Sequence, residues 1–470
     1  MADTEYWQQD AAGLARLLDA GAVTPSDLLE MYLERCERLE PVLNAFFYLD
    51  RRGARRSAAE ATERQRSGRR LGPLDGIPVS VKDNLYVAGM PASWGSLMFQ
   101  EHIPERDDIC VERLRKAGAV ILGKTTTPEF ALMGRTENRL TGVTRNPWDP
   151  ALTPGGSSGG AVAAVAAGLV PLSVGTDAGG STRMPAGYTG LVGLRPSNGR
   201  VPRCYGFPPM ALDFQAIGPI CRTMADLDLM LAVMAGADHR DPASLNLPPL
   251  VAPSRPLRIG WFVAIGEETV DKEVAESHRE AREALAALGH QLVECEPPFD
   301  LAELRALWDT LTPVGAARVA SLKPGWETDA TAQIVDLTRQ GLGMPAVEYV
   351  RAIDRLQAFR RETSSQWGGY DALLIPTAAA PAWAADLDAP PTIAGRPGNG
   401  ATQGMFCGWV NAMGYCGLNV PGRQHPDGRP IGLQIVAPFG LDGIAIDIGR
   451  QLERALPWSE RWPDLAISPR

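Results

Sequence analysis

The chain has 470 residues, a formal net charge of −9, a pI of about 5.3 and 45% hydrophobic residues. Such an acidic chain is unsuited to a broad nucleic-acid surface, and its longest uncharged apolar stretch, 161–175, is too short to span a bilayer. We therefore expect neither nucleic acid nor a membrane as a partner. Seven cysteines without a CxxC pair or zinc-like spacing predict reduced thiols and no metal, and no cofactor is expected. The N-terminus carries no signal-like pattern, so a cytoplasmic location is expected.

Helices and short apolar strands alternate along the first half of the chain. The patterns predict helices at 24–39, 54–66 and 111–118, and strands at 76–82 and 119–123. In the first of these strands, Ile77, Val79 and Val81 share one face, while Ser80 and Lys82 share the other. A helix followed by a strand is the recurring unit of an α/β fold.

Two clusters of glycine and serine lie within this pattern, at 155–160 and 179–181. The first precedes an alanine-rich helix at 161–168 and a strand at 171–176, and the second belongs to a turn at 177–181. Farther on, we expect a surface connection at 237–260, strands at 257–263 and 371–376, a helix at 273–288 and a long loop at 378–404. Loops of that length are often lids over functional sites.

A serine in a glycine-rich turn is a candidate nucleophile, because the turn's N–H groups can face a developing oxyanion. Residues 155–159 fit G-x-S-x-G, the nucleophile elbow of α/β-hydrolases. That elbow needs a preceding strand and a histidine base, whereas 146–154 holds three prolines and none of the five histidines lies in a motif. A neutral, buried lysine is the other available base, and Lys82 is the best candidate because it ends an apolar strand. Taken alone, a surface lysine at a strand end would be the simpler interpretation.

The segments around both clusters resemble the signature block of the amidase signature family. The resemblance is carried by residues 155–168, 174–183 and 185–186. It extends, in the same order along the chain, to 117–124, 146–148, 190–193, 217–219, 371–376 and 432–434. This family includes fatty acid amide hydrolase, indoleacetamide hydrolases and the glutaminase component of glutamyl-tRNA amidotransferase, and its members use a Ser–cis-Ser–Lys triad.

The resemblance implies a role for each matched residue. Ser181 matches the nucleophile, Ser157 matches the bridging serine that follows a cis peptide bond, and Lys82 matches the base. The oxyanion donors match the backbone N–H groups of Ala178, Gly179, Gly180 and Ser181, and supporting positions match Ser158, Asp177 and Arg183. Thr182 and Arg195-Pro-Ser depart from the usual family residues, which affects the expected packing of the pocket and not the triad.

The resemblance also implies the architecture: one compact α/β domain over 1–470, with a large mixed central sheet covered by helices on both sides. Length alone favours two or three domains instead. Within the single domain we expect N-terminal helices at 1–70, a catalytic core at 71–235, a variable substrate-pocket region at 236–404 and a return to the core at 405–470.

The expected reaction is hydrolysis of a carbon–nitrogen bond in a small molecule, through an acyl-enzyme on Ser181. The candidate pocket residues are aromatic, methionine or small: Phe130, Ala131, Met133, Gly134, Tyr205, Phe207, Met405 and Trp409. Their character favours an apolar acyl or aryl group, as in an acylamide, anilide, hydrazide or aryl carbamate.

Two alternative functions stay open. Residues 135–148 resemble the glutaminase component of a tRNA-dependent amidotransferase, although 199–206 departs from its usual stretch by one extra residue. The second alternative is a non-catalytic binding protein on the same fold, against which the intact triad argues. A homodimer is compatible with the sequence.

Overall fold

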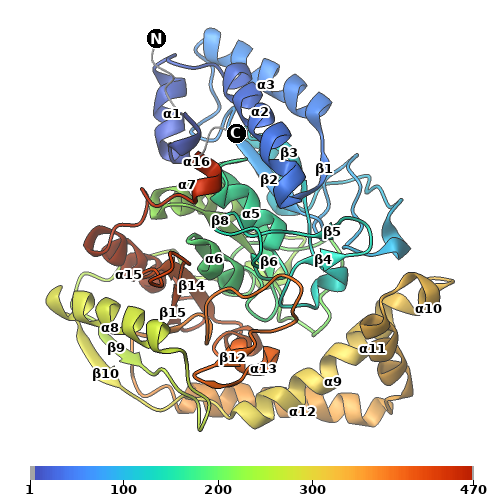
Figure 1. Cartoon of the computed structure of the whole chain (residues 1–470), viewed down its shortest axis with the longest axis vertical. Helices are drawn as coiled ribbons and strands as arrows, with labels where there is room; N and C mark the ends of the chain where they lie inside the picture. The colour runs from blue at the N-terminus through green and yellow to red at the C-terminus, as the bar shows by residue number, and fades with distance from the viewer. Residues whose placement is uncertain (1–5, 468–470) are drawn as a thin grey trace.

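The computed structural model describes residues 6–467, and one mixed sheet of 11 strands runs through this part of the chain (Figure 1). The strand order is β1-β3-β2-β6-β8-β7-β14-β15-β11-β9-β10. The strands are β1 (Phe46–Leu49), β2 (Pro78–Lys82), β3 (Val120–Thr125), β6 (Leu172–Asp177), β7 (Val192–Arg195), β8 (Ala216–Cys221), β9 (Arg258–Trp261), β10 (Gln291–Glu294), β11 (Ala372–Pro376), β14 (Cys416–Pro421) and β15 (Gly432–Ala437). Two small hairpins are β4 (Glu137–Asn138) with β5 (Gly142–Val143), and β12 (Thr392–Ile393) with β13 (Arg396–Pro397).

The helices vary widely in length. They are α1 (Ala11–Asp19), α2 (Pro25–Leu43), α3 (Arg51–Arg66), α4 (Ile109–Lys116), α5 (Gly159–Ala166), α6 (Arg183–Thr189), α7 (Met224–Met234), α8 (Lys272–Ala287), α9 (Leu301–Ala320), α10 (Trp326–Asp329), α11 (Ala332–Gly343), α12 (Ala346–Ser365), α13 (Gly400–Gln403), α14 (Gly408–Met413), α15 (Asp442–Ala455) and α16 (Asp464–Ile467). Short 3-10 turns occupy Tyr6–Gln8, Leu97–Phe99, Glu129–Ala131 and Pro242–Ser244.

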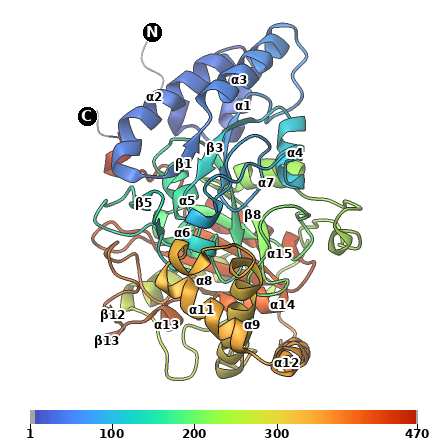
Figure 2. The ribbon, with the colours of Figure 1, turned by 90° about the vertical axis from the view of Figure 1, so that its right-hand side faces the viewer.

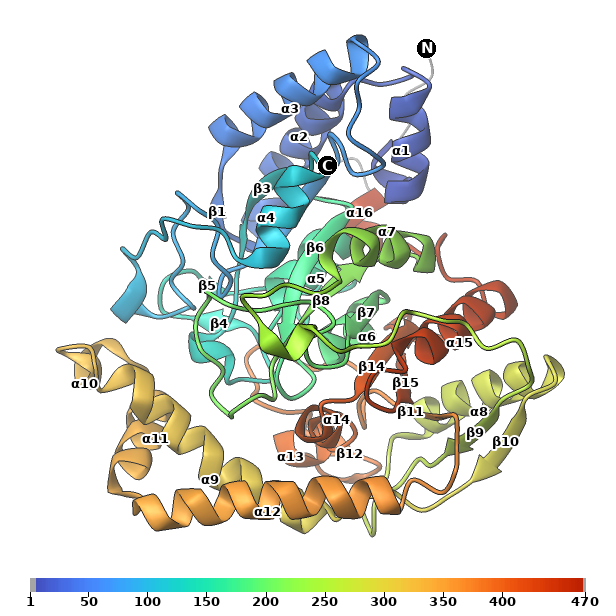
Figure 3. The ribbon, with the colours of Figure 1, turned by 180° about the vertical axis from the view of Figure 1, so that it is seen from behind.

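Helices cover both faces of the sheet, as predicted. On one face, α4, α7, α8 and α15 share an apolar core with β2, β6, β7 and β14 (Figure 3). On the opposite face, α2, α3 and α5 share a second core with β3 and β8, and α6 lies against β7, β14 and β15 (Figure 1). A single sheet with two covered faces agrees with the one α/β domain that the resemblance implied, and not with the two or three domains that length alone favoured.

The position of Lys82 at one edge of the sheet follows from how β2 pairs. This strand is parallel to both β3 and β6, with Val81 opposite Lys124 on one side and Val174 on the other. Parallel strands end at the same edge, so Lys82 at the end of β2 is brought beside Asp177 at the end of β6. Two residues that are distant in sequence thus meet at one edge.

The segment between β10 and β11 forms a separate helical layer. Helices α9 and α11 pack against each other, and α12 runs along the outside (Figures 2 and 3). In Figure 1 this layer lies at the end of the molecule away from α2 and α3. It falls within the region expected to vary with the substrate, 236–404.

Most predicted elements form, with shifted ends. The helix predicted at 54–66 begins at Arg51, because the Asp50 side chain caps it by accepting from Gly53 N at 2.9 Å. The loop at 378–404 contains the β12–β13 hairpin and α13. The residues before the Gly/Ser cluster, 146–154, belong to no strand of the sheet, which removes the strand that a nucleophile elbow requires.

All seven cysteines are free thiols, as the sequence predicted. Among residues 6–467, none of the helices combines the length and the apolar character needed to cross a bilayer.

Candidate active site

Lys82 is completely buried at the end of β2. Its Nζ donates to Ser157 Oγ at 2.7 Å and to Ser158 Oγ at 2.9 Å, with the Thr176 carbonyl 3.4 Å away. Burial lowers the pKa of Lys82 to about 7, against the opposing attraction of the Asp177 carboxylate. A large fraction of this amine is therefore neutral near pH 7, which is the form that can accept a proton.

Ser157 lies on the first Gly/Ser cluster, which packs closely against its neighbours. The Gly156–Ser157 peptide bond is cis. A Cβ on Gly156 would lie 2.4 Å from the Met133 carbonyl oxygen and 2.8 Å from that of Arg135, so only glycine fits there. The backbone of residues 133–135 thereby fixes the path of the chain just before Ser157.

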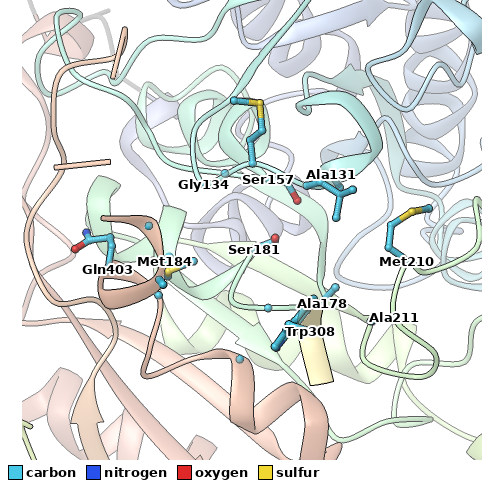
Figure 4. A pocket seen from close by; sticks show the side chains of 18 of the residues that line it. Ala131, Gly134, Ser157, Ala178, Ser181, Met184, Met210, Ala211, Trp308 and Gln403 are labelled. Atoms are coloured by element: carbon cyan, nitrogen blue, oxygen red, sulfur yellow. The ribbon is translucent and has the colours of Figure 1, made fainter. Parts of the chain in front are cut away.

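Ser181 lies opposite Ser157, at the end of the turn that follows β6. Ser158 N donates to the Ser181 carbonyl at 3.1 Å, which ties the two Gly/Ser clusters together. Figure 4 shows the Ser157 and Ser181 side chains pointing toward one another from two segments of the chain. Their hydroxyl groups do not hydrogen-bond to each other in the described contacts, so the Lys82–Ser157 link of the predicted triad is formed and the Ser157–Ser181 link is open.

The turn at 177–183 is organised by the Asp177 carboxylate. It accepts from the backbone N–H groups of Gly180 at 2.8 Å and Thr182 at 3.1 Å. It also accepts from Arg183 Nε at 2.9 Å and Nη2 at 2.8 Å, and both side chains are buried. Burial alone would raise the pKa of Asp177, but the Arg183 guanidinium outweighs it and holds that pKa well below its usual range.

The geometry changes the expected set of oxyanion donors. Ala178, Gly179 and Ser181 line the pocket, whereas the Gly180 N–H is used by Asp177. The φ of Gly180 is +116°, and a Cβ there would lie 2.7 Å from that of Cys407. Gly180 therefore shapes the turn, and the remaining three N–H groups are the candidates to face an oxyanion.

Asn411 and Gln434 extend this network and were missed by the sequence analysis. Asn411 Nδ2 donates to Asp177 Oδ1 at 2.9 Å and to the Asp177 carbonyl at 3.0 Å, and Arg183 Nη2 donates to Asn411 Oδ1 at 2.6 Å. Arg183 Nη1 donates to Gln434 Oε1. These residues lie on α14 and β15, far along the chain from Asp177. Gln434 falls within a segment that resembles the family, and that resemblance was the only signal for it.

A pocket of about 440 Å³ opens above Ser157 and Ser181. Five of the predicted pocket residues line it: Phe130, Ala131, Met133, Gly134 and Met405.

The other three predicted pocket residues lie elsewhere in the described structure. Tyr205 is half-buried beside the guanidinium groups of Arg106 and Arg240. Phe207 stacks on Trp94 behind Phe130. Trp409 is buried against Phe299, because its face of α14 turns toward α9 and α12.

Several pocket residues were not expected from the sequence. They include Met184, Tyr188, Met210, Trp308, Trp383 and Gln403. Helix α9 adds Leu301, Leu304, Arg305, Trp308 and Asp309, which recur with the spacing of one helical face. That spacing indicates that these residues share one face of α9, but it does not indicate what this face packs against.

The chain is similar to amidases along nearly its whole length. Residues 27–444 match the Amidase family. An acylamidase of Rhodococcus erythropolis is 32% identical over 471 aligned residues, which cover 96% of each chain. The A component of the glutamyl-tRNA(Gln) amidotransferase of Synechococcus sp. (strain WH7803) is 32% identical, covering 98% of this chain and 99% of its own. The solved structure of a bacterial aryl acylamidase of the amidase signature family has a TM-score of 0.89 at 26% identity, covering 98% of this chain and 99% of its own.

The chain therefore belongs to the amidase signature family, as its sequence resemblance indicated. It is an amide-hydrolysing enzyme.

We expect the turn to depend on the Asp177–Arg183 pair. Arg183→Met would leave a buried carboxylate without its cation, which typically costs about 3–5 kcal/mol of the free energy of unfolding. Asp177→Asn in the same chain should recover part of that loss, because no unpaired charge would remain. The measurement is the urea unfolding midpoint of the two single variants and the double variant.

A matched control is Arg55→Met, which breaks an exposed pair with Glu30. That pair is solvated, so the midpoint should move far less. Equal shifts for the Arg183 and Arg55 variants would contradict a special role for the buried pair.

Proposed function

We propose that this amidase cleaves its substrate through an acyl-enzyme on Ser181, with Ser157 and Lys82 as the proton relay. The observation that carries the proposal is the buried Lys82 amine, with its lowered pKa, hydrogen-bonded to Ser157 at the floor of a pocket that Ser181 also lines. A neutral amine at this position can take a proton from Ser157 Oγ, which in turn can take one from Ser181.

The proposed reaction runs in two stages. The Ser181 Oγ attacks the amide carbon, and the oxyanion that forms is held by the N–H groups of Ala178, Gly179 and Ser181. Ser157 then passes a proton to the amide nitrogen, the carbon–nitrogen bond breaks and the amine leaves. In the second stage, water gives a proton to the same relay and attacks the ester carbon. The carbon–oxygen bond to Ser181 breaks, the relay returns the proton to Ser181 Oγ, and the carboxylic acid leaves.

The proposed substrate is a small molecule with an apolar or aryl group. Methionine and aromatic side chains dominate the pocket near Ser181, and such walls favour apolar groups over charged ones. The similarity to an acylamidase and to a bacterial aryl acylamidase supports the same class of substrate.

A second candidate function is glutamine hydrolysis in a multi-component amidotransferase. It is favoured by the 32% identity to the A component of such an enzyme over nearly the whole chain. We expect the isolated chain to hydrolyse an anilide with a higher kcat/KM than glutamine, because the pocket near Ser181 is apolar. Parallel assays that release aniline and ammonia test this. Faster turnover of glutamine, or turnover only after addition of partner proteins, would favour the amidotransferase.

The activity should depend on pH through Lys82. Since the neutral amine is the base and its pKa lies at about 7, kcat/KM should be full above that pH. Below it, kcat/KM should fall about tenfold per pH unit as the amine becomes protonated. The measurement is a pH profile of kcat/KM on one anilide between about pH 5 and pH 9, with about one measurement for every half pH unit. A rate that is flat through this range, or that rises toward acid, would exclude Lys82 as the base.

Lys82 and Ser157 should act as one unit. Lys82→Ala removes the base and should lower kcat/KM by about 10²–10⁴. Ser157→Ala interrupts the path from Lys82 to Ser181 and should cause a loss of similar size. The double variant should have nearly the same kcat/KM as the slower of the two single variants, because both residues serve one proton path. If the losses of the two single variants multiply in the double variant, the two residues act independently and the relay is refuted.

A further inference from the structure

The apolar walls of the pocket belong to three hydrophobic clusters. Met184, Tyr188 and Trp383 pack together in one cluster, Phe130 and Met210 belong to a second, and Leu304 and Met405 belong to a third. Figure 4 shows Ser181 between the first two, with Met184 and Gln403 on one side and Met210 and Ala211 on the other. The nucleophile therefore faces two apolar surfaces that do not share a common core.

The first surface, here called the first lobe, consists of Met184, Tyr188, Trp383 and Gln403. The Tyr188 and Trp383 rings meet edge to face with centroids 5.5 Å apart. Gln403 Nε2 donates to the Tyr188 hydroxyl at 2.7 Å and to the Ala380 carbonyl at 2.8 Å. These contacts fix the two aromatic rings, so the first lobe has a preformed shape.

The second lobe consists of Phe130, Ala131, Leu132 and Met210. The Phe130 ring stacks on Trp94 with centroids 4.7 Å apart, and Phe130 N donates to the Trp94 carbonyl at 3.0 Å. Met210 is buried within the same cluster. The second lobe is therefore also held in place by its own packing.

Trp308 from α9 lies between the lobes, against the turn that carries Ser181. A Cβ on Gly179 would lie 3.2 Å from the Trp308 ring. Charged residues line the pocket as well, but Arg305, Asp309 and Asp388 are at least partly exposed, and neither lobe contains a charged side chain. An apolar group of a substrate can thus contact an apolar lobe on either side of Ser181.

We propose that the pocket takes amides substituted at nitrogen, with the acyl group in the first lobe and the nitrogen substituent in the second. This inference rests on the proposed function, in which Ser157 protonates the leaving nitrogen. That nitrogen must face Ser157, and the segment that continues the second lobe, residues 133–135, runs directly past Gly156. The substituent on nitrogen therefore points into the second lobe, and the acyl group is left to the first.

A substrate of this class uses both lobes, whereas a primary amide uses one. Cleavage of a primary amide releases ammonia, which gains nothing from an apolar wall. A glutamine side chain would in addition carry its charged amino and carboxylate groups toward an apolar surface. The two lobes therefore select for anilide-like amides over glutamine.

Three related substrates separate the lobes: acetanilide has its ring on nitrogen, benzamide has its ring on the acyl carbon, and benzanilide has both. Met184→Trp and Met210→Trp make the same substitution on opposite sides of Ser181. We expect Met184→Trp to lower kcat/KM for benzamide at least about tenfold more than for acetanilide, because the added ring fills the first lobe. Met210→Trp should give the opposite order, and each variant should impair benzanilide.

Labelling of Ser181 by a fluorophosphonate, measured in parallel, reports a folded active site without using an amide. If the wild-type enzyme is neither labelled nor active on any amide, the proposed function itself fails. If it is labelled and active, but the two variants lose activity on all three substrates in equal proportion, the two-lobe inference is overturned. A reversed order of losses overturns the assignment of the lobes.

Discussion

The contact on which the whole site depends is the buried pair of Asp177 and Arg183. A carboxylate without a partner would be very unfavourable at this depth, and the Arg183 guanidinium makes its charged form stable there. Once charged, Asp177 can hold the N–H groups of Gly180 and Thr182 and so fix the turn that presents Ser181. Burial lowers the pKa of the nearby Lys82 even though the Asp177 carboxylate opposes that shift.

The sheet and the turn together bring the polar groups of the site to one place. Because β2 and β6 are parallel neighbours, their ends bring Lys82 and the turn that carries Ser181 to one place. The cluster around Ser157 then closes against the backbone of residues 133–135, where a side chain on Gly156 could not fit. Main-chain packing thus fixes the position of Ser157, while the Asp177–Arg183 side chains fix the position of Ser181.

The sequence predicted the parts of the site that depend on local pattern. The α/β alternation, the strand ending at Lys82 and the two Gly/Ser clusters could be read directly, whereas nothing local in α14 indicates that Asn411 reaches Asp177. The residues that line the pocket were harder still to predict from the sequence. Aromatic content suggested Phe130 and Trp409 equally, but only Phe130 lines the pocket, since tertiary packing decides which way each side chain faces. Trp308 was missed because the sequence of α9 shows no distinct apolar face, so nothing local indicates which of its side chains line the pocket.

The origin of α9 has a consequence for how this enzyme could diversify. The proposed catalytic residues lie between β2 and the start of α6, whereas α9 enters from a helical layer placed between two strands at the far side of the sheet. Mutations in α9 reach the pocket through Trp308 and its neighbours on the same face, and they leave the proposed proton relay unchanged. Selection can therefore alter the wall that α9 adds to the pocket while a lineage inherits intact both lobes, whose residues lie outside 301–365, and the proposed catalytic residues.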